Sequence, residues 1–155
     1  MTSRPTYDTL FAAAHEGIAA VPIGGEPWLA KLAAAMKACA PDSLHVMRTV
    51  HAQVDGLAQA AIMETRGINC ARQVEAHYEN LKGALSHAYL MAPEVARPYL
   101  IDPGNERQWQ VFAAALEAAP RQQLENADYR HAQGGMAARI VASRAGNNEQ
   151  RSAGC

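Results

Sequence analysis

Residues 43–91 read SLHVMRTVHAQVDGLAQAAIMETRGINCARQVEAHYENLKGALSHAYLM, and the phase of their apolar residues decides the fold. Two apolar stripes recur here at the three-and-four spacing of an amphipathic helix. The first comprises Met47, Val50, Val54, Leu57 and Ala61, and the second comprises Val74, Tyr78, Leu81, Leu85 and Ala88. On one continuous helix, at about 100° per residue, Val74 would lie roughly 180° around from Met47.

The two stripes fall out of phase at Arg66-Gly67-Ile68-Asn69. A single helix would carry them on opposite faces, whereas a chain reversal at residues 67–69 lets them face each other. Asn69 is suited to cap the second helix. We therefore predict a long antiparallel helical hairpin, with helices at about 43–66 and 70–91.

Three more segments carry a helical stripe. They are Tyr7, Leu10, Phe11, Ala14, Ile18 and Val21; then Trp28, Leu29, Leu32, Met36 and Cys39; then Trp109, Phe112, Ala113 and Leu116. Thr6 is placed to cap the first of these helices, and Pro27 suits the first turn of the second, after a turn-rich loop at 22–25. Asn105 with Gln108 resembles a capping box, and we expect the helix that follows to be short.

Beyond Pro120 the apolar residues divide between two helical faces. Leu124, Ala127, His131 and Ala138 share one face, and Tyr129, Met136 and Ile140 share the other. Two apolar faces predict contacts on both sides of this segment. Gly134-Gly135 is a candidate break, because two adjacent glycines cost roughly 2 kcal/mol of helix propensity relative to alanine. From residue 144 the chain is polar, so we predict one helical domain over 1–143 and a flexible tail over 144–155.

Alanine dominates the apolar composition, with 33 alanines among 155 residues. Alanine is the strongest helix former and lets helices approach closely. The composition therefore favours an all-α fold, a bundle of five or six helices built around the hairpin. Few large apolar side chains remain for the interior, and so many small ones also suit an interface between subunits. We expect a homo-oligomer, with a dimer as the simplest form.

Charge and cysteine content limit the partners and the compartment. A formal net charge of −1 and a pI near 6.6 provide no field that attracts nucleic acid or an anionic membrane. No apolar run approaches membrane-spanning length, and the N-terminus does not read as a signal peptide. Cys39, Cys70 and Cys155 have no CxxC or metal spacing, which fits a reducing cytoplasm. The bias for arginine and alanine points to a GC-rich, bacterial genome.

Residues 93–104 contain three prolines, which exclude a regular helix. The segment also contains Val95, Tyr99, Leu100 and Ile101, which are too apolar for a solvated linker. We predict an ordered loop across the bundle. It is either a crossover packed by Tyr99 and Leu100 or an element that carries a binding function.

Six histidines raise the question of a metal or haem site: His15, His45, His51, His77, His87 and His131. Helical phase places His51 inside the apolar arc and His77 at its edge. With a turn near Ile68, His51 would lie opposite Leu85, roughly 12 Å along the axis from His77. A metal needs three or four ligands within about 2.0–2.3 Å of one point. Because HExxH, Glu-x-x-His and CxxCH motifs are also missing, we expect no metal or other cofactor.

No nucleophile is paired with a base in the sequence. Cys39 and Cys70 lie on apolar stripes, where a thiol is inert, and adjacent Ser86 and His87 diverge by about 100° on a helix. We therefore favour a non-enzymatic binding or regulatory protein, such as an adaptor, inhibitor, chaperone or immunity protein, that binds a protein partner or a second copy of itself. The residues expected to bind the partner are Tyr99, Leu100, Tyr129, Met136 and Ile140.

The alternative is a small-molecule or cofactor pocket within the bundle, which leaves room for catalysis by a histidine. Its lining would come from the residues that phase directs inward on the hairpin and on the helix after Asn105. These residues are His51, His77, Tyr78, Tyr89 and Trp109. A pocket protein should have a cavity that both histidines reach, whereas a protein-binding module should have its histidines hydrogen-bonded in a full core.

Overall fold

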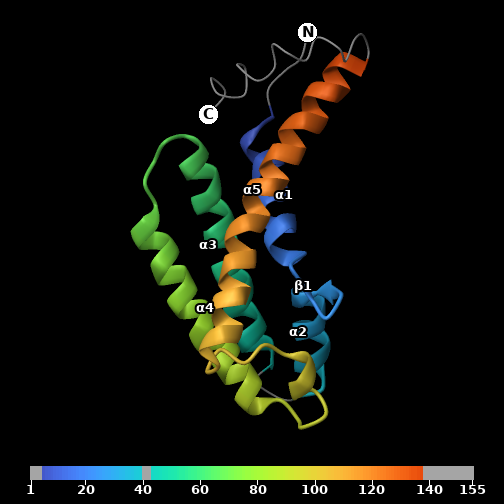
Figure 1. Ribbon diagram of the computed structural model, residues 1–155, viewed down its shortest axis with the longest axis vertical. Coiled ribbons are helices and arrows are strands. Elements are labelled where there is room, and N and C mark those ends of the chain that lie inside the picture. The colour runs from blue at the N-terminus through green and yellow to red at the C-terminus, as the bar shows by residue number, and fades with distance from the viewer. Residues whose placement is uncertain (1–4, 40–42, 138–155) are drawn as a thin grey trace.

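The computed structural model describes residues 5–39 and 43–137, with side chains described as far as Tyr129. These residues form an all-α bundle, which confirms the predicted fold class (Figure 1). The predicted tail over 144–155 lies outside the described residues. The helices are α1 (Tyr7–Ala19), α2 (Trp28–Lys37), α3 (Ser43–Thr65), α4 (Ala71–Met91), the short 3-10 helix η1 (Arg97–Tyr99) and α5 (Glu106–Ala137).

α3 and α4 form the predicted antiparallel hairpin. After α3 ends, Gly67 has a φ of 81°, in the left-handed region that glycine adopts without a Cβ clash. The N-cap of α4 is Cys70 and not the predicted Asn69, but the side chain of Asn69 accepts a hydrogen bond of 2.9 Å from the amide of Ala71 at the start of the helix. The two stripes meet in the interior, where their buried members include Val50, Val54, Leu57, Leu81 and Leu85.

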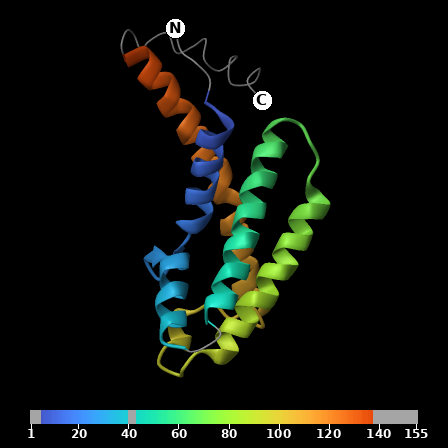
Figure 2. The same cartoon turned by 180° about the vertical axis from the view of Figure 1, so that it is seen from behind.

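α4 starts partway down α3 and not at its tip, because residues 66–70 run back beside the end of α3 (Figure 2). His77 therefore lies beside Gln53, whose Oε1 is 2.9 Å from the histidine Nδ1. The register predicted from the sequence, with His51 and His77 roughly 12 Å apart along the axis, is wrong. The two histidines are separated by direction instead. His77 contacts the face of α3 that carries Gln53, and His51 points about 200° away from Gln53 around α3.

A short β-hairpin joins α1 to α2. Strands β1 (Pro22–Ile23) and β2 (Glu26–Pro27) pair antiparallel around Gly24-Gly25, whose φ angles are 64° and 90°. The sequence predicted only a turn-rich loop here. The turn directs Trp28 back onto the end of α1, where its Nε1 donates a hydrogen bond of 2.7 Å to the carbonyl of Ile18. Carbonyls in the last turn of a helix lack an intrahelical partner, so this bond satisfies one of them.

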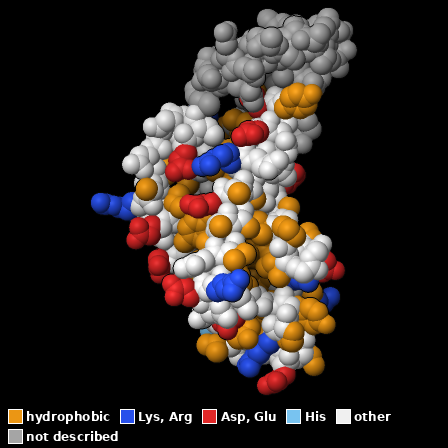
Figure 3. Space-filling view, in the orientation of Figure 1, with side chains coloured by type: hydrophobic (Ala, Val, Ile, Leu, Met, Phe, Trp, Pro, Cys, Tyr) orange, Lys and Arg blue, Asp and Glu red, His pale blue; other side chains and the backbone are white. Residues whose placement is uncertain are grey.

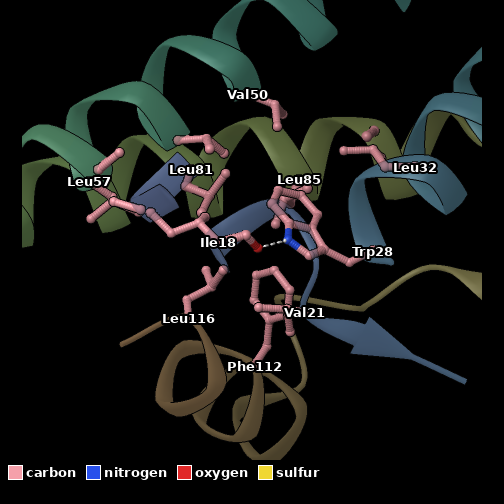
Figure 4. Close-up of a cluster of buried hydrophobic side chains, with 14 of the residues drawn as sticks. Ile18, Val21, Trp28, Leu32, Val50, Leu57, Leu81, Leu85, Phe112 and Leu116 are labelled. Carbon is pink, nitrogen blue, oxygen red and sulfur yellow. Dashed lines mark hydrogen bonds between the residues drawn. The ribbon is translucent and has the colours of Figure 1, made fainter. Parts of the chain in front are cut away.

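The hydrophobic core is arranged around Trp28, which is 1% exposed (Figure 4). Its indole meets the ring of Phe112 edge-on, with 5.2 Å between ring centroids. Such a pair stabilises by about 0.5–1.5 kcal/mol beyond the burial of its area. Trp28 therefore links α1, α2 and α5. The side chains around it include Ile18, Val21, Leu32, Val50, Leu57, Leu81, Leu85 and Leu116.

α5 is one helix that continues through Pro120. The prediction of a short helix before Pro120 is therefore wrong, and α5 also continues past Gly134-Gly135. Proline inside a helix costs about 3 kcal/mol, so tertiary packing must offset that cost. Pro120 is buried, and α5 packs closely on α1 at Gly17, where a Cβ would lie 2.7 Å from the carbonyl oxygen of Ala119. The absence of a side chain at Gly17 allows this contact.

The segment between α4 and α5 is the ordered loop that the sequence predicted. Leu100 and Ile101 pack against the core, and the Arg97 guanidinium donates hydrogen bonds of 3.2 and 3.3 Å to two carbonyls at the end of α4. Tyr99 is 61% exposed, and the Lys31 ammonium lies 5.6 Å from its ring centroid. Leu100 packs inward as expected, whereas Tyr99 lies on the surface.

Replacing Gly56 by alanine tests the contact between α3 and α4. In an open helix the change gains about 0.5–1 kcal/mol, but at this position a Cβ would overlap the His77 ring. Because overpacking costs about 1–3 kcal/mol, we expect Gly56→Ala to lower the free energy of unfolding measured by urea titration.

Gly83→Ala is the matched control on α4, because a Cβ there meets nothing within 4 Å. It should raise the free energy of unfolding by about 0.5–1 kcal/mol. Equal stabilisation by the two alanines would contradict the close contact between Gly56 and His77.

Candidate functional site

A groove lies between the α3–α4 hairpin and the middle of α5, and we call it the α5 groove. It holds about 300 Å³. Along this boundary hydrophobic side chains reach the surface, with acidic and basic side chains beside them (Figure 3). Its lining comes from three helices: Leu57, Ala61, Glu64 and Thr65 of α3, Val74 and Tyr78 of α4, and Leu116, Glu117, Pro120, Arg121 and Leu124 of α5.

The groove opens because α5 contacts different helices along its length. Near its start, Trp109 packs edge-on against Tyr78 of α4, with 6.3 Å between ring centroids. Farther along, α5 packs on α1 at Gly17 and moves away from α4 (Figure 1). The Tyr78–Trp109 contact therefore closes one end of the groove. From there the groove runs beside Leu116–Leu124 of α5, a rise of about 12 Å.

Tyr78 occupies the closed end of the α5 groove. Its hydroxyl lies 3.4 Å from the carbonyl oxygen of Ala113, to which it donates. Burial raises the pKa of Tyr78 well above its ordinary value, and the nearby carboxylates of Glu117 and Glu64 raise it further. The hydroxyl therefore stays protonated at neutral pH and remains a hydrogen-bond donor.

Charged side chains border the groove on two walls. Glu64 stands on α3, whereas Glu117 and Arg121 stand one turn apart on α5. The ion pairs between described side chains are His15–Asp55 and Arg97–Glu94, so neither of them involves a groove residue. The groove combines an apolar floor with two carboxylates and one guanidinium, an excess of one negative charge.

The structure does not gather the five predicted ligand-binding residues into one pocket. Tyr78 lines the groove, and Trp109 supports it. His51 is exposed, so the expectation that it faces inward is wrong, although Ala58 and Ile62, within about 20° of it around α3, are buried farther along the helix. Tyr89 lies near the other end of α4, where its ring centroid is 5.8 Å from the Arg97 guanidinium.

His77 serves the packing of the hairpin. Its ring lies against Gly56, and its Nδ1 donates to Oε1 of Gln53, so this nitrogen carries the proton. Among the other histidines, His15 pairs with Asp55 at 2.9 Å. Within the described residues no group of three or more His, Cys, Asp or Glu side chains is arranged to hold a metal ion.

The residues predicted to bind a partner also do not form one surface. Tyr99 and Leu100 lie at one end of the molecule, by the start of α5, and Tyr129 is exposed far along α5 toward the other end (Figure 1). The side chain of Met136 and the whole of Ile140 lie outside what the structure describes. Of these predicted residues, Tyr99 and Tyr129 are therefore exposed on two separate surfaces, whereas Leu100 packs against the core.

Sequence reasoning identified part of the groove without recognising it. The periodicity of residues 43–91 assigned Leu57, Ala61 and Val74 to contacts within the hairpin, and the charged residues Glu64, Glu117 and Arg121 were missed. One signal was available, because the apolar face that includes Leu124 predicted a second contact surface beyond Pro120. No local pattern specifies where two packed helices separate.

No helix among the described residues is both long and apolar enough to cross a membrane. The chain matches no protein-family model, no curated protein and no solved structure. Its function is therefore inferred from the geometry and the charges of the α5 groove.

The environment of Tyr78 predicts a late step in an alkaline titration. The folded state favours the neutral hydroxyl, so this group stabilises the fold below the ordinary tyrosine pKa of about 10, and the contribution is lost as pH rises beyond it. The absorbance of tyrosinate should therefore contain a component that appears only at a pH well above this ordinary pKa. Tyr78→Phe should remove it, whereas Tyr129→Phe, at an exposed position, should leave it in place. Survival of the late component in Tyr78→Phe would show that another group produces it.

Proposed function

We propose that this chain is a non-enzymatic helical protein of the bacterial cytoplasm that binds a protein partner, or a second copy of itself, through the α5 groove. Adaptor, inhibitor, chaperone and immunity roles all need such a surface. One observation carries the proposal: apolar side chains from three helices line a groove that runs between α5 and the hairpin. Cys39 and Cys70 are free and buried, which agrees with a reducing compartment.

The dimensions of the groove favour a helix as its occupant. An amphipathic helix binds by laying apolar residues at i, i+3, i+4 and i+7 into a hydrophobic groove. The wall from Leu57 to Thr65 rises about 12 Å, which matches two turns of such a helix. Ala61 stands in the middle of this wall, where its short side chain leaves room for an incoming one.

A small-molecule site is the second candidate, and Tyr78 is the observation that favours it. Its hydroxyl donates to the Ala113 carbonyl, so the hydroxyl oxygen can accept a hydrogen bond at this closed end, beside the apolar ring of Trp109. Small-molecule sites usually hold about 300–1,000 Å³, so the groove is at the lower limit. Native mass spectrometry of the protein purified from its own cells would detect a retained small molecule as a fixed increase in mass.

Filling the groove from inside tests the protein-binding proposal. Ala61→Phe adds a large side chain at the wall of the groove, so it should abolish co-purification of the partner from the source cell. Ala52→Phe is the matched control, because Ala52 is exposed about 180° around α3 from Ala61. It should retain the partner, and both variants should keep the helical circular dichroism of the parent protein.

The comparison has two outcomes that contradict the proposal. In one, a partner is recovered equally with Ala61→Phe and with Ala52→Phe, which would place its binding surface elsewhere. In the other, the parent protein yields neither a partner nor a self-associated species. Analytical ultracentrifugation of the parent and of Ala61→Phe separates binding to another protein from assembly of this chain with itself.

A further inference from the structure

The charges on the α5 groove indicate what kind of side chain its occupant carries. Glu64 and Glu117 belong to helices on opposite sides of the groove, and the Tyr78 hydroxyl lies at its closed end. A positively charged group placed between these two carboxylates would be attracted from both walls. An acidic group would be repelled from both.

The Tyr78 hydroxyl lies within electrostatic reach of both carboxylates. Both Glu117 and Glu64 disfavour the ionised form of this group. An added negative charge near Tyr78 is therefore opposed from each wall, and an added positive charge is favoured by the same interaction. Because Glu64 and Glu117 are exposed, this attraction is screened by salt.

Arg121 cancels only part of this attraction. Its one positive charge is set against two carboxylates in the lining, and no ion pair between described side chains joins it to Glu64 or Glu117. A guanidinium on the same helix as Glu117, one turn away, moderates the field on the α5 side. The α3 side retains Glu64. The net charge of the groove lining is therefore negative.

We infer that the α5 groove binds an amphipathic helix whose apolar face carries one lysine or arginine, with the cationic end placed between Glu64 and Glu117. The inference rests on the proposed protein-binding function and specifies the chemistry of the partner. Apolar residues one turn before and after the basic residue would occupy the floor beside Leu57 and Leu124. The basic residue would lay its methylene stem on Val74 and extend its charge to the rim.

Three synthetic peptides test the inference. Each is an acetylated and amidated helix of about 16 residues, built from alanine, glutamine and serine, with leucines one turn on either side of a central position. The peptides differ only at that position, which is lysine, glutamine or glutamate. Calorimetric titration into the full-length protein at low salt should give a Kd for the lysine peptide at least about tenfold lower than for the glutamine peptide. The glutamate peptide should bind weakest.

Charge-neutral variants locate the effect. Glu64→Gln combined with Glu117→Gln should reduce the preference for lysine over glutamine to less than about twofold. Glu16→Gln combined with Glu26→Gln is the matched control: it removes the same net charge at two exposed positions outside the groove, and it should preserve the tenfold preference. Added salt should reduce the preference in the parent protein.

The outcomes separate this inference from the proposed function. Equal affinity for the lysine and glutamine peptides, lost in Ala61→Phe, would overturn the charge inference and leave protein binding by the groove intact. No binding of any peptide at about 1 mM would also overturn the inference, while co-purification with Ala61→Phe tests the proposed function separately. A dimer that Ala61→Phe converts to a monomer would identify a second copy as the occupant and overturn the inference in favour of self-assembly.

Discussion

The hydrogen bond and the ring contact made by Trp28 hold the bundle together. The indole N–H satisfies the Ile18 carbonyl at the end of α1, and the ring meets Phe112 of α5 inside the core. One side chain therefore holds two consecutive helices, α1 and α2, against α5, which lies far along the chain. The Gly24-Gly25 turn makes this possible, because it brings the start of α2 directly under the end of α1.

Trp28 holds the start of α5. The direction that α5 takes from there determines where the α5 groove opens. Trp109 and Phe112 anchor its first turns against the hairpin and Trp28, and Gly17 of α1 accepts its middle turns at close range. Two such attachments in different directions separate α5 from α4. The α5 groove results from that separation, and it receives a negative rim because Glu64 and Glu117 come from the two helices that border it.

Histidines illustrate how packing assigns a role that residue type does not specify. His77 could have been a ligand, yet its ring fills the space that Gly56 leaves open and its Nδ1 bonds to Gln53. His51, which helical phase directed inward, is exposed, whereas Ala58 and Ile62, which lie within about 20° of it around α3, are buried farther along the same helix. Phase locates a side chain on its own helix, whereas burial depends on the width of the neighbouring surface.

The sequence by itself determined the all-α class, the hairpin of α3 and α4, the caps at Thr6 and Asn105, and the ordered loop before α5. These features follow from local propensity, capping and periodicity over neighbouring residues. Only the tertiary structure decided the offset of α4 along α3, the passage of α5 through Pro120 and the opening of the α5 groove. Each of these depends on contacts between segments that are not neighbours in the sequence, such as His77 with Gly56 and Gly17 with Ala119, and neither helix propensity nor periodicity specifies which distant residues meet.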